Sequence, residues 1–205
     1  MKIYEKADKI IEKLSRIPVK RSGLYFLCCS QKLLPLYERF SEETEFGHVV
    51  ELEKIMDLLW AKFKEKGGFY CVEEYRSIVT ENTPHREDFD TVYSVIAQDL
   101  CLCLDSALCG ISEGMLDLNT ANYSWDAVYT AVYYELTGKA DMNGDKSRHL
   151  KDMLSEDARI IGEFAWQNEL IKRISTKGNI LDLNGIRDWT RFNAWSVKKL
   201  LHEKN

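Results

Sequence analysis

Two short stretches of this chain gather carboxylate side chains, and these are the groups whose type and spacing most suggest chemistry. The acids are Glu42, Glu43 and Glu45 in the first stretch and Glu87, Asp88 and Asp90 in the second. Paired carboxylates serve enzymes as general acids and bases, and clustered carboxylates also bind basic protein surfaces. At helix ends such acids interact with the helix dipole and keep a protein soluble, which is the simpler interpretation.

Aromatic residues flank both acidic stretches. Tyr37 and Phe46 lie near the first, and Phe89 and Tyr93 lie near the second. Carboxylates rimmed by aromatic rings suit a surface that recognises a Lys- or Arg-rich partner. We therefore predict that the six acids form a partner-binding surface.

The spacing of the other reactive side chains does not predict a metal, cofactor or catalytic site. Cys101 and Cys103 would point about 200° apart on a helix, so they do not clasp one ion. A helical zinc site uses histidines four residues apart, a spacing that this chain lacks. The chain also has no Gly-rich phosphate loop between a strand and a helix, so the sequence does not predict a nucleotide site. The histidines, of which no two share a helical turn, are His48, His85, His149 and His202. We expect no metal, no cofactor and no enzymatic activity.

One alternative class stays open, an uncharacterised cytoplasmic enzyme or small-ligand-binding helical protein. A buried Cys71 or His85 in a polar pocket would favour it. A deep pocket that contains a titratable residue with a perturbed pKa would also indicate this class, whereas a core without cavities would oppose it.

Composition and charge limit the type of protein. The chain has 205 residues and a formal net charge of −5, although residues 1–22 hold seven basic and three acidic residues. The acidic remainder disfavours nucleic acid as a partner. We see no signal peptide and no apolar run of the roughly 18 residues that a membrane span needs, so we expect a cytoplasmic protein with reduced cysteines.

Hydrophobic periodicity predicts the elements that must position these groups. Helical patterns cover residues 3–14, 24–36 (continuing to about 45), 52–63, 69–80, 124–138, 147–176 and 184–202. Between the fourth and the fifth of these, a further helix is predicted to start at Thr83-Pro84 and to carry an apolar stripe from Phe89 to Ile111. The helix over 124–138 is predicted to run from Ser124 to Gly138. No run alternates cleanly enough for a strand pair. We predict an all-α fold of seven to eight antiparallel helices in a compact bundle, forming a single domain over residues 1–205. The polar stretch 139–146 is the predicted seam if there are subdomains.

The residue pattern of the stretch 28–48 is explained first by how one helix packs and ends. The run 24–36 is apolar on nearly every side, so the helices packed around it can support Pro35 inside a helix. Cys28 and Cys29 suit a place where another helix crosses closely. Phe46-Gly47 makes the turn into the next helix.

The same stretch also carries a resemblance. Leu33-Leu34-Pro35, Tyr37, Phe40 and Phe46-Gly47, followed by "LEKIMDLLW" at 52–60, are similar to the bacterial YjaG-like family, a domain of unknown function. The stretch "IIGEFAWQNELIKRI" at 160–174 is similar to that family's long helix with a Phe-Ala-x-Gln-Glu pattern. His48 stands where the family has Asp, and the segment after 178 differs. The resemblance implies an all-helical bundle and supplies no catalytic residues.

These observations lead to one functional hypothesis. A small acidic helical protein without a catalytic constellation suits neutralisation of a basic toxin. We therefore expect an immunity protein that binds a cognate basic toxin of the nuclease type through the six acids. We expect no nucleic-acid or membrane partner, and a homodimer stays open.

Overall fold

The computed structural model describes residues 2–64, 72–139, 148–176 and 181–200, and those residues form an all-α fold. The α-helices are α1 (Ile3–Leu14), α2 (Val19–Thr44), α3 (Val49–Lys64), α4 (Val72–Glu81), α5 (Val92–Leu108), α6 (Asn122–Thr137), α7 (Arg148–Glu156), α8 (Ala158–Ser175), α9 (Leu183–Phe192) and α10 (Val197–Leu200). Short turns η1 (Arg86–Asp88), η2 (Cys109–Glu113) and η3 (Leu118–Ala121) join some of them. The predicted helical bundle is confirmed.

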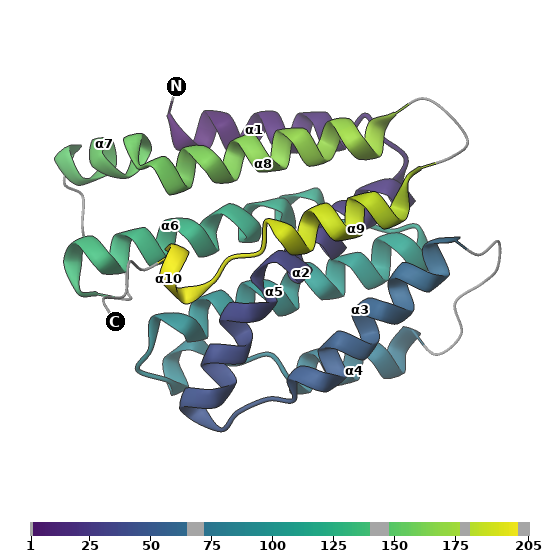
Figure 1. The fold of residues 1–205 in the computed structure, drawn as a ribbon, viewed down its shortest axis with the longest axis horizontal. Helices are drawn as coiled ribbons and strands as arrows, with labels where there is room; N and C mark the ends of the chain where they lie inside the picture. The colour runs from purple at the N-terminus through teal and green to yellow at the C-terminus, as the bar shows by residue number, and fades with distance from the viewer. Residues whose placement is uncertain (1, 65–71, 140–147, 177–180, 201–205) are drawn as a thin grey trace.

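Helix α2 is the centre of the bundle, as its run 24–36, which is apolar on nearly every side, predicts. It packs along α5, while α1 and α8 run side by side on one flank and α3 and α4 lie on the other (Figure 1). α2 continues through Pro35 and is buried from Ser22 to Leu34. A Cβ on Gly23 would lie 2.8 Å from the amide nitrogen of Ile111, so only glycine allows this close crossing.

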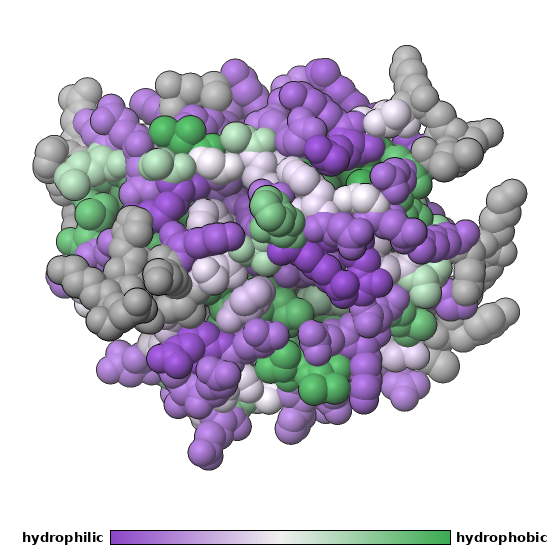
Figure 2. All heavy atoms as spheres, viewed as in Figure 1, coloured by the Kyte–Doolittle hydropathy of each residue, from purple (hydrophilic) through white to green (hydrophobic). Residues whose placement is uncertain are grey.

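Helix α5 is the most apolar element. By length and composition the segment Val92–Glu113 could cross a membrane, but 72% of it is buried inside the protein. That burial is the property of a core helix, and the buried hydrophobic residues of all the helices form one continuous cluster. Hydrophilic side chains cover most of the face over α8 and α9, with separate hydrophobic patches (Figure 2).

The predicted helix start at Thr83-Pro84 is wrong. Residues 86–88 form only a 3₁₀ turn, and Phe89 is extended, with φ −132° and ψ 125°. α5 begins at Val92, where the Thr91 hydroxyl accepts a hydrogen bond from the amide of Tyr93. Phe89 therefore leaves the helical stripe and packs elsewhere.

The predicted start of α6 at Ser124, taken as the residue that caps the helix, is also wrong. α6 begins at Asn122, and Ser124 lies inside it with its hydroxyl buried against Glu163. Gly138 does end the helix, in the left-handed conformation with φ 69°.

Two helices predicted as continuous are each divided. Asp157 is extended, and its carboxylate accepts a hydrogen bond from the amide of Arg159, which separates α7 from α8. α9 and α10 are separated because Trp195 turns inward and its amide donates to the carbonyl of Lys32, 3.0 Å away. Periodicity alone does not register such breaks, since both flanking segments keep helical spacing. The predicted seam at 139–146 lies, apart from Lys139, outside the described residues.

Candidate binding sites

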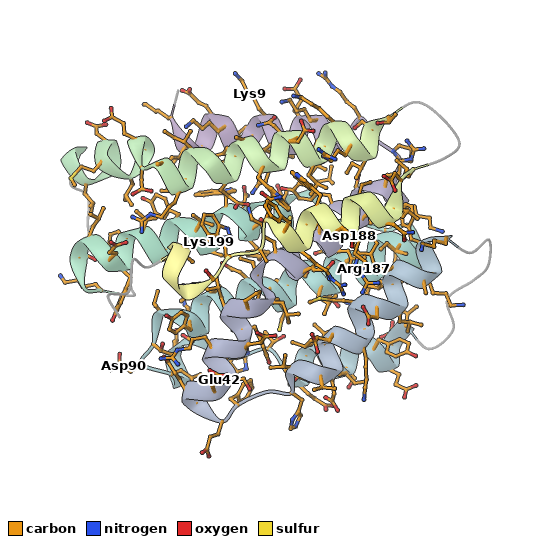
Figure 3. All side chains as sticks on the ribbon, viewed as in Figure 1. Lys9, Glu42, Asp90, Arg187, Asp188 and Lys199 are labelled. Carbon is orange, nitrogen blue, oxygen red and sulfur yellow. The ribbon has the colours of Figure 1, made fainter. Side chains whose placement is uncertain are left out.

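The fold brings the two predicted acidic stretches together at one end of the molecule. Figure 3 shows both Glu42 and Asp90 at that end. The Thr91 hydroxyl donates to Glu43 Oε2 at 3.4 Å, which connects the stretches directly. All six predicted acids are exposed. We call this surface the acidic end: Glu42, Glu43, Glu45, Glu87, Asp88 and Asp90.

An aromatic cluster joins the two stretches. Phe89 packs against Phe40 and Phe46, with ring centroids 5.0 and 5.2 Å apart respectively. Phe46 and Phe89 are partly buried, so they form a rim beside the acids. The other two predicted rim residues, Tyr37 and Tyr93, are instead buried in the core.

The side chains of Tyr37 and Asn82 hold the turn at Phe46-Gly47 in place. Gly47 has φ +80°, and the Tyr37 hydroxyl occupies the space that a Cβ would need. That hydroxyl donates to the carbonyl of Asn82 at 2.7 Å, and Asn82 Oδ1 accepts from the amide of His48. The motif residues therefore fix where α2, α3 and α4 meet, which supports the structural interpretation of this stretch.

The acidic end is larger than the sequence indicated. Burial, together with Glu53 and then Glu42, raises the pKa of Glu38, so carboxylates crowd along α2 and α3 as well. Arg39 pairs with Glu43 at 2.8 Å and lies 3.8 Å from Glu42. Helical spacing of four residues along α2 could have indicated Glu38 beside Glu42. The surface remains rich in carboxylates with few cations, which suits a basic partner.

The structure places only one of the two residues named for the alternative class. His85 is exposed, and Cys71 lies outside the described residues. Within the described ranges no group of three or more His, Cys, Asp or Glu side chains is placed to hold a metal ion.

A pocket of about 430 Å³ does open elsewhere, between α1, α6 and α7. Its walls include Tyr4, Trp125 and Tyr129, and its polar side chains include Asp8 and Asp126. Trp125 and Tyr129 stand four residues apart on α6, a spacing that is typical of a core-facing stripe. They are core-facing, but α1 and α7 leave the end of that stripe open.

Asp126 is a titratable group of this pocket whose pKa is perturbed. Burial raises its pKa to about 6, and the positive charge of Arg86 partly opposes that rise. Asp99 on α5 is only 4% exposed, and its Oδ2 has no hydrogen-bond partner. Burial, and then the charge of Asp126, raises the pKa of Asp99 well above its ordinary value. Two carboxyl groups therefore share one poorly solvated region next to the pocket.

A buried ion pair, missed by the sequence analysis, lies at the centre of the bundle. Lys32 on α2 donates to Glu163 on α8, and their side chains are 4% and 1% exposed. The remaining donors to Glu163 are Ser124 at 3.1 Å, Gln167 at 3.0 Å and Trp195 Nε1 at 3.0 Å. The carboxylate is thus satisfied on both oxygens.

Aromatic rings enclose the cation of this pair. Lys32 Nζ lies 3.9 Å from the ring centroid of Trp166 and 5.0 Å from that of Trp195. Burial lowers the pKa of Lys32, and the charge of Glu163 opposes that effect. Since four separate chain segments meet at this ion pair, the arrangement holds α2, α6, α8 and the α9–α10 segment together. A single Lys within an apolar run was the sequence signal for it.

Comparison with known proteins gives the chain a family. Residues 9–196 match the family model described as "Protein of unknown function (DUF416)". The chain belongs to the DUF416 family. The matched range includes the segment with Trp189 and Trp195, which the sequence resemblance had set apart.

The relatives agree with this assignment. The chain is 22% identical over 125 residues to "Uncharacterized protein YjaG" of Salmonella typhimurium and of Escherichia coli, covering 61% of this chain and 64% of each relative's length. The chain therefore matches slightly less than two thirds of those relatives. A solved DUF416 family protein from Shewanella baltica OS155 superimposes with a TM-score of 0.74 and 20% identity, over 91% of this chain and 95% of that one. These likenesses support the fold and the predicted YjaG-like family.

Proposed function

We propose that this DUF416 protein is a non-enzymatic binding protein whose acidic end recognises a basic partner protein. One observation carries the proposal: two acidic stretches far apart in sequence converge on the Phe40–Phe46–Phe89 cluster and are linked through Thr91 and Glu43. Convergence matters because the field of clustered charges adds, which steers a partner of opposite sign and orients it on docking.

The rim supplies what charge alone lacks. Phe46 and Phe89 place partly exposed apolar surface beside the carboxylates. Interfaces gain specificity when a desolvated aromatic patch is bordered by charged groups that match the partner. A toxin neutralised in the cytoplasm, for which a basic nuclease is the example, fits this requirement, and we propose an immunity role of that kind.

Calorimetric titration against the protein encoded by the adjoining open reading frame tests the proposal. We expect nanomolar binding that weakens when the salt concentration rises from about 50 to about 300 mM, because salt screens exposed charges. Absence of binding at the lower concentration would contradict the proposed partner.

Charge reversal then tests the surface. Replacing Glu87, Asp88 and Asp90 by Lys should slow association about tenfold at low salt. The matched control reverses three exposed acids outside the acidic end, Asp152, Glu156 and Asp188, and changes the net charge equally. If the association rate falls by the same factor in both triple variants, net charge rather than the acidic end governs binding.

A second function has support from one observation. The pocket between α1, α6 and α7 contains Asp126, whose pKa burial raises to about 6. A pocket with a perturbed titratable group favours the small-ligand-binding class. Screening small ligands by thermal shift, with Asp126→Asn as the comparison, would test that class.

A further inference from the structure

The aromatic walls of the pocket stand at right angles to one another. The Tyr4 ring meets the Trp125 indole at 85°, with centroids 6.1 Å apart, and the Tyr129 ring meets it at 82° and 5.8 Å. Tyr123 and Tyr133 complete the aromatic lining. Five aromatic side chains therefore line one space, and the negative face of an aromatic ring attracts a cation.

The central wall is held in place. Trp125 is 6% exposed, and its indole stacks on Phe164 at a centroid distance of 5.8 Å. Its Nε1 donates to Asn122 Oδ1 at 3.1 Å. A ring fixed in this way costs little further entropy when a ligand binds.

The charge of the pocket has one sign. Asp8 and Asp126 line it, and no Lys or Arg lies among the described residues of its lining. Among the residues that the structure places, Asp126 forms no hydrogen bond or ion pair, although it is partly buried. Asp99 on α5, whose Oδ2 is buried and has no hydrogen-bond partner, lies near enough for the charge of Asp126 to raise its pKa. The charge of Arg86 in η1 acts on Asp126 without forming an ion pair with it, so the described lining offers this carboxylate no cation to bind.

From this geometry we propose that the pocket binds a small organic cation of the quaternary ammonium class. The inference deepens the small-ligand function and does not depend on the acidic end. A quaternary ammonium has no N–H groups to satisfy, so aromatic faces suit it better than they suit a primary amine. The volume of about 430 Å³ lies within the range of about 300–1,000 Å³ that small-molecule sites occupy.

Choline chloride is the probe, with 3,3-dimethylbutan-1-ol as its neutral isostere. Binding is measured by isothermal titration calorimetry and by quenching of tryptophan fluorescence. We expect saturable choline binding and at least about tenfold weaker binding of the neutral alcohol, because only the cation gains from the rings and the carboxylates. Equal binding of the two compounds, or no binding of choline, would overturn the proposal.

Two variants locate the site. Asp126→Asn should weaken choline binding about tenfold, and Tyr4→Leu about threefold, since one carboxylate and one ring are lost. Tyr4 is 67% exposed, so its replacement does not threaten folding. The controls are Asp152→Asn and Tyr134→Leu, which change an exposed acid on α7 and an exposed ring on α6 that does not line the pocket. Unchanged affinity in both pocket variants would refute the assignment.

The pH dependence gives an independent readout. The groups that face Asp126 from the packed elements are Asp99 on α5, Arg86 in η1 and Tyr123 on α6, and the pocket adds Asp8 on α1. Because burial raises the pKa of Asp126 to about 6, choline affinity should rise as the pH increases through that value. The rise should disappear in Asp126→Asn. Affinity that is flat with pH in the wild-type protein would contradict the role of this carboxylate.

A trimethyllysine peptide distinguishes the source of the ammonium group. If the peptide binds more tightly than choline, the natural cation belongs to a protein side chain. If choline binds more tightly, it belongs to a free small molecule. Either result supports the cation site, and failure of both compounds to bind removes it.

Discussion

Replacement of Lys32 by Met should destabilise the protein by about 3–5 kcal/mol, the range for breaking a buried ion pair on one side. The change leaves Glu163 charged at a site that is 1% exposed, with only the neutral donors Ser124, Gln167 and Trp195. It also removes the cation from the rings of Trp166 and Trp195. Methionine keeps the length of the side chain, so lost volume contributes little.

The partner variant should be milder. Glu163→Gln leaves Lys32 without its counterion, but burial already lowers the pKa of Lys32, so the ammonium can lose its proton. The double variant Lys32→Met/Glu163→Gln removes both charges. We expect it to be less destabilised than the sum of the single variants, by at least about 1 kcal/mol.

Urea denaturation followed by circular dichroism measures this four-member cycle. The surface pair Arg16–Glu12, whose side chains are 71% and 61% exposed, provides the control, and Arg16→Met should change the free energy of unfolding by no more than about 0.5 kcal/mol. Single-variant effects that add within about 0.5 kcal/mol would refute the reasoning, because they would show that the two buried charges do not depend on each other.

Three further outcomes follow from the contacts. Asp126→Asn should raise the free energy of unfolding above about pH 7 and leave it unchanged below about pH 4. The pKa of Asp126 is about 6 in the folded protein and 3.8, the ordinary value for Asp, in the unfolded chain, so the wild-type protein loses stability as the pH rises between those two values. Gly23→Ala should cost about 1–3 kcal/mol in urea denaturation, whereas Gly162→Ala, whose Cβ meets nothing within 4 Å, should stabilise its helix. Iodoacetamide should alkylate the partly exposed Cys109 before Cys28, whose pKa burial raises to about 12, and mass spectrometry after native labelling would show the order.

The sequence predicted the bundle because its signals are local and periodic. The apolar run of α2 and the stripe of α5 each determine a buried helix without reference to the rest of the chain. The breaks were not predictable in the same way. Asp157 and Trp195 interrupt helices through a cap and a long-range amide bond, and helical spacing continues on both sides.

The candidate sites were likewise predictable from the sequence only where their signals are local. The acidic stretches were visible as composition, but their meeting depends on Phe89 leaving its helix to pack on Phe40. The ion pair joins residues 131 positions apart, so only its solitary Lys32 gave a signal. The pocket was hidden because Trp125 and Tyr129 are core residues by pattern, and it is the packing of α1 and α7 that leaves one end open.

Arg86 connects the two proposed sites, and its removal should affect them differently. It lies in η1 beside the acids Glu87 and Asp88, and its charge partly opposes the rise in pKa that burial causes at Asp126 and Asp99. Arg86→Gln should therefore make the acidic end more negative and speed association with a basic partner at low salt. In the pocket, the pH at which choline affinity rises should move above about 6, since the charge that favours ionised Asp126 is gone.

The two readouts of Arg86→Gln are separable, because the first is a rate with a protein partner and the second is a titration with a small molecule. A faster partner association with an unmoved choline titration would mean that Arg86 does not act on Asp126 and would remove that link from the pocket. A shifted choline titration with an unchanged association rate would instead show that the partner does not approach through η1. Each proposal can therefore fail without the other.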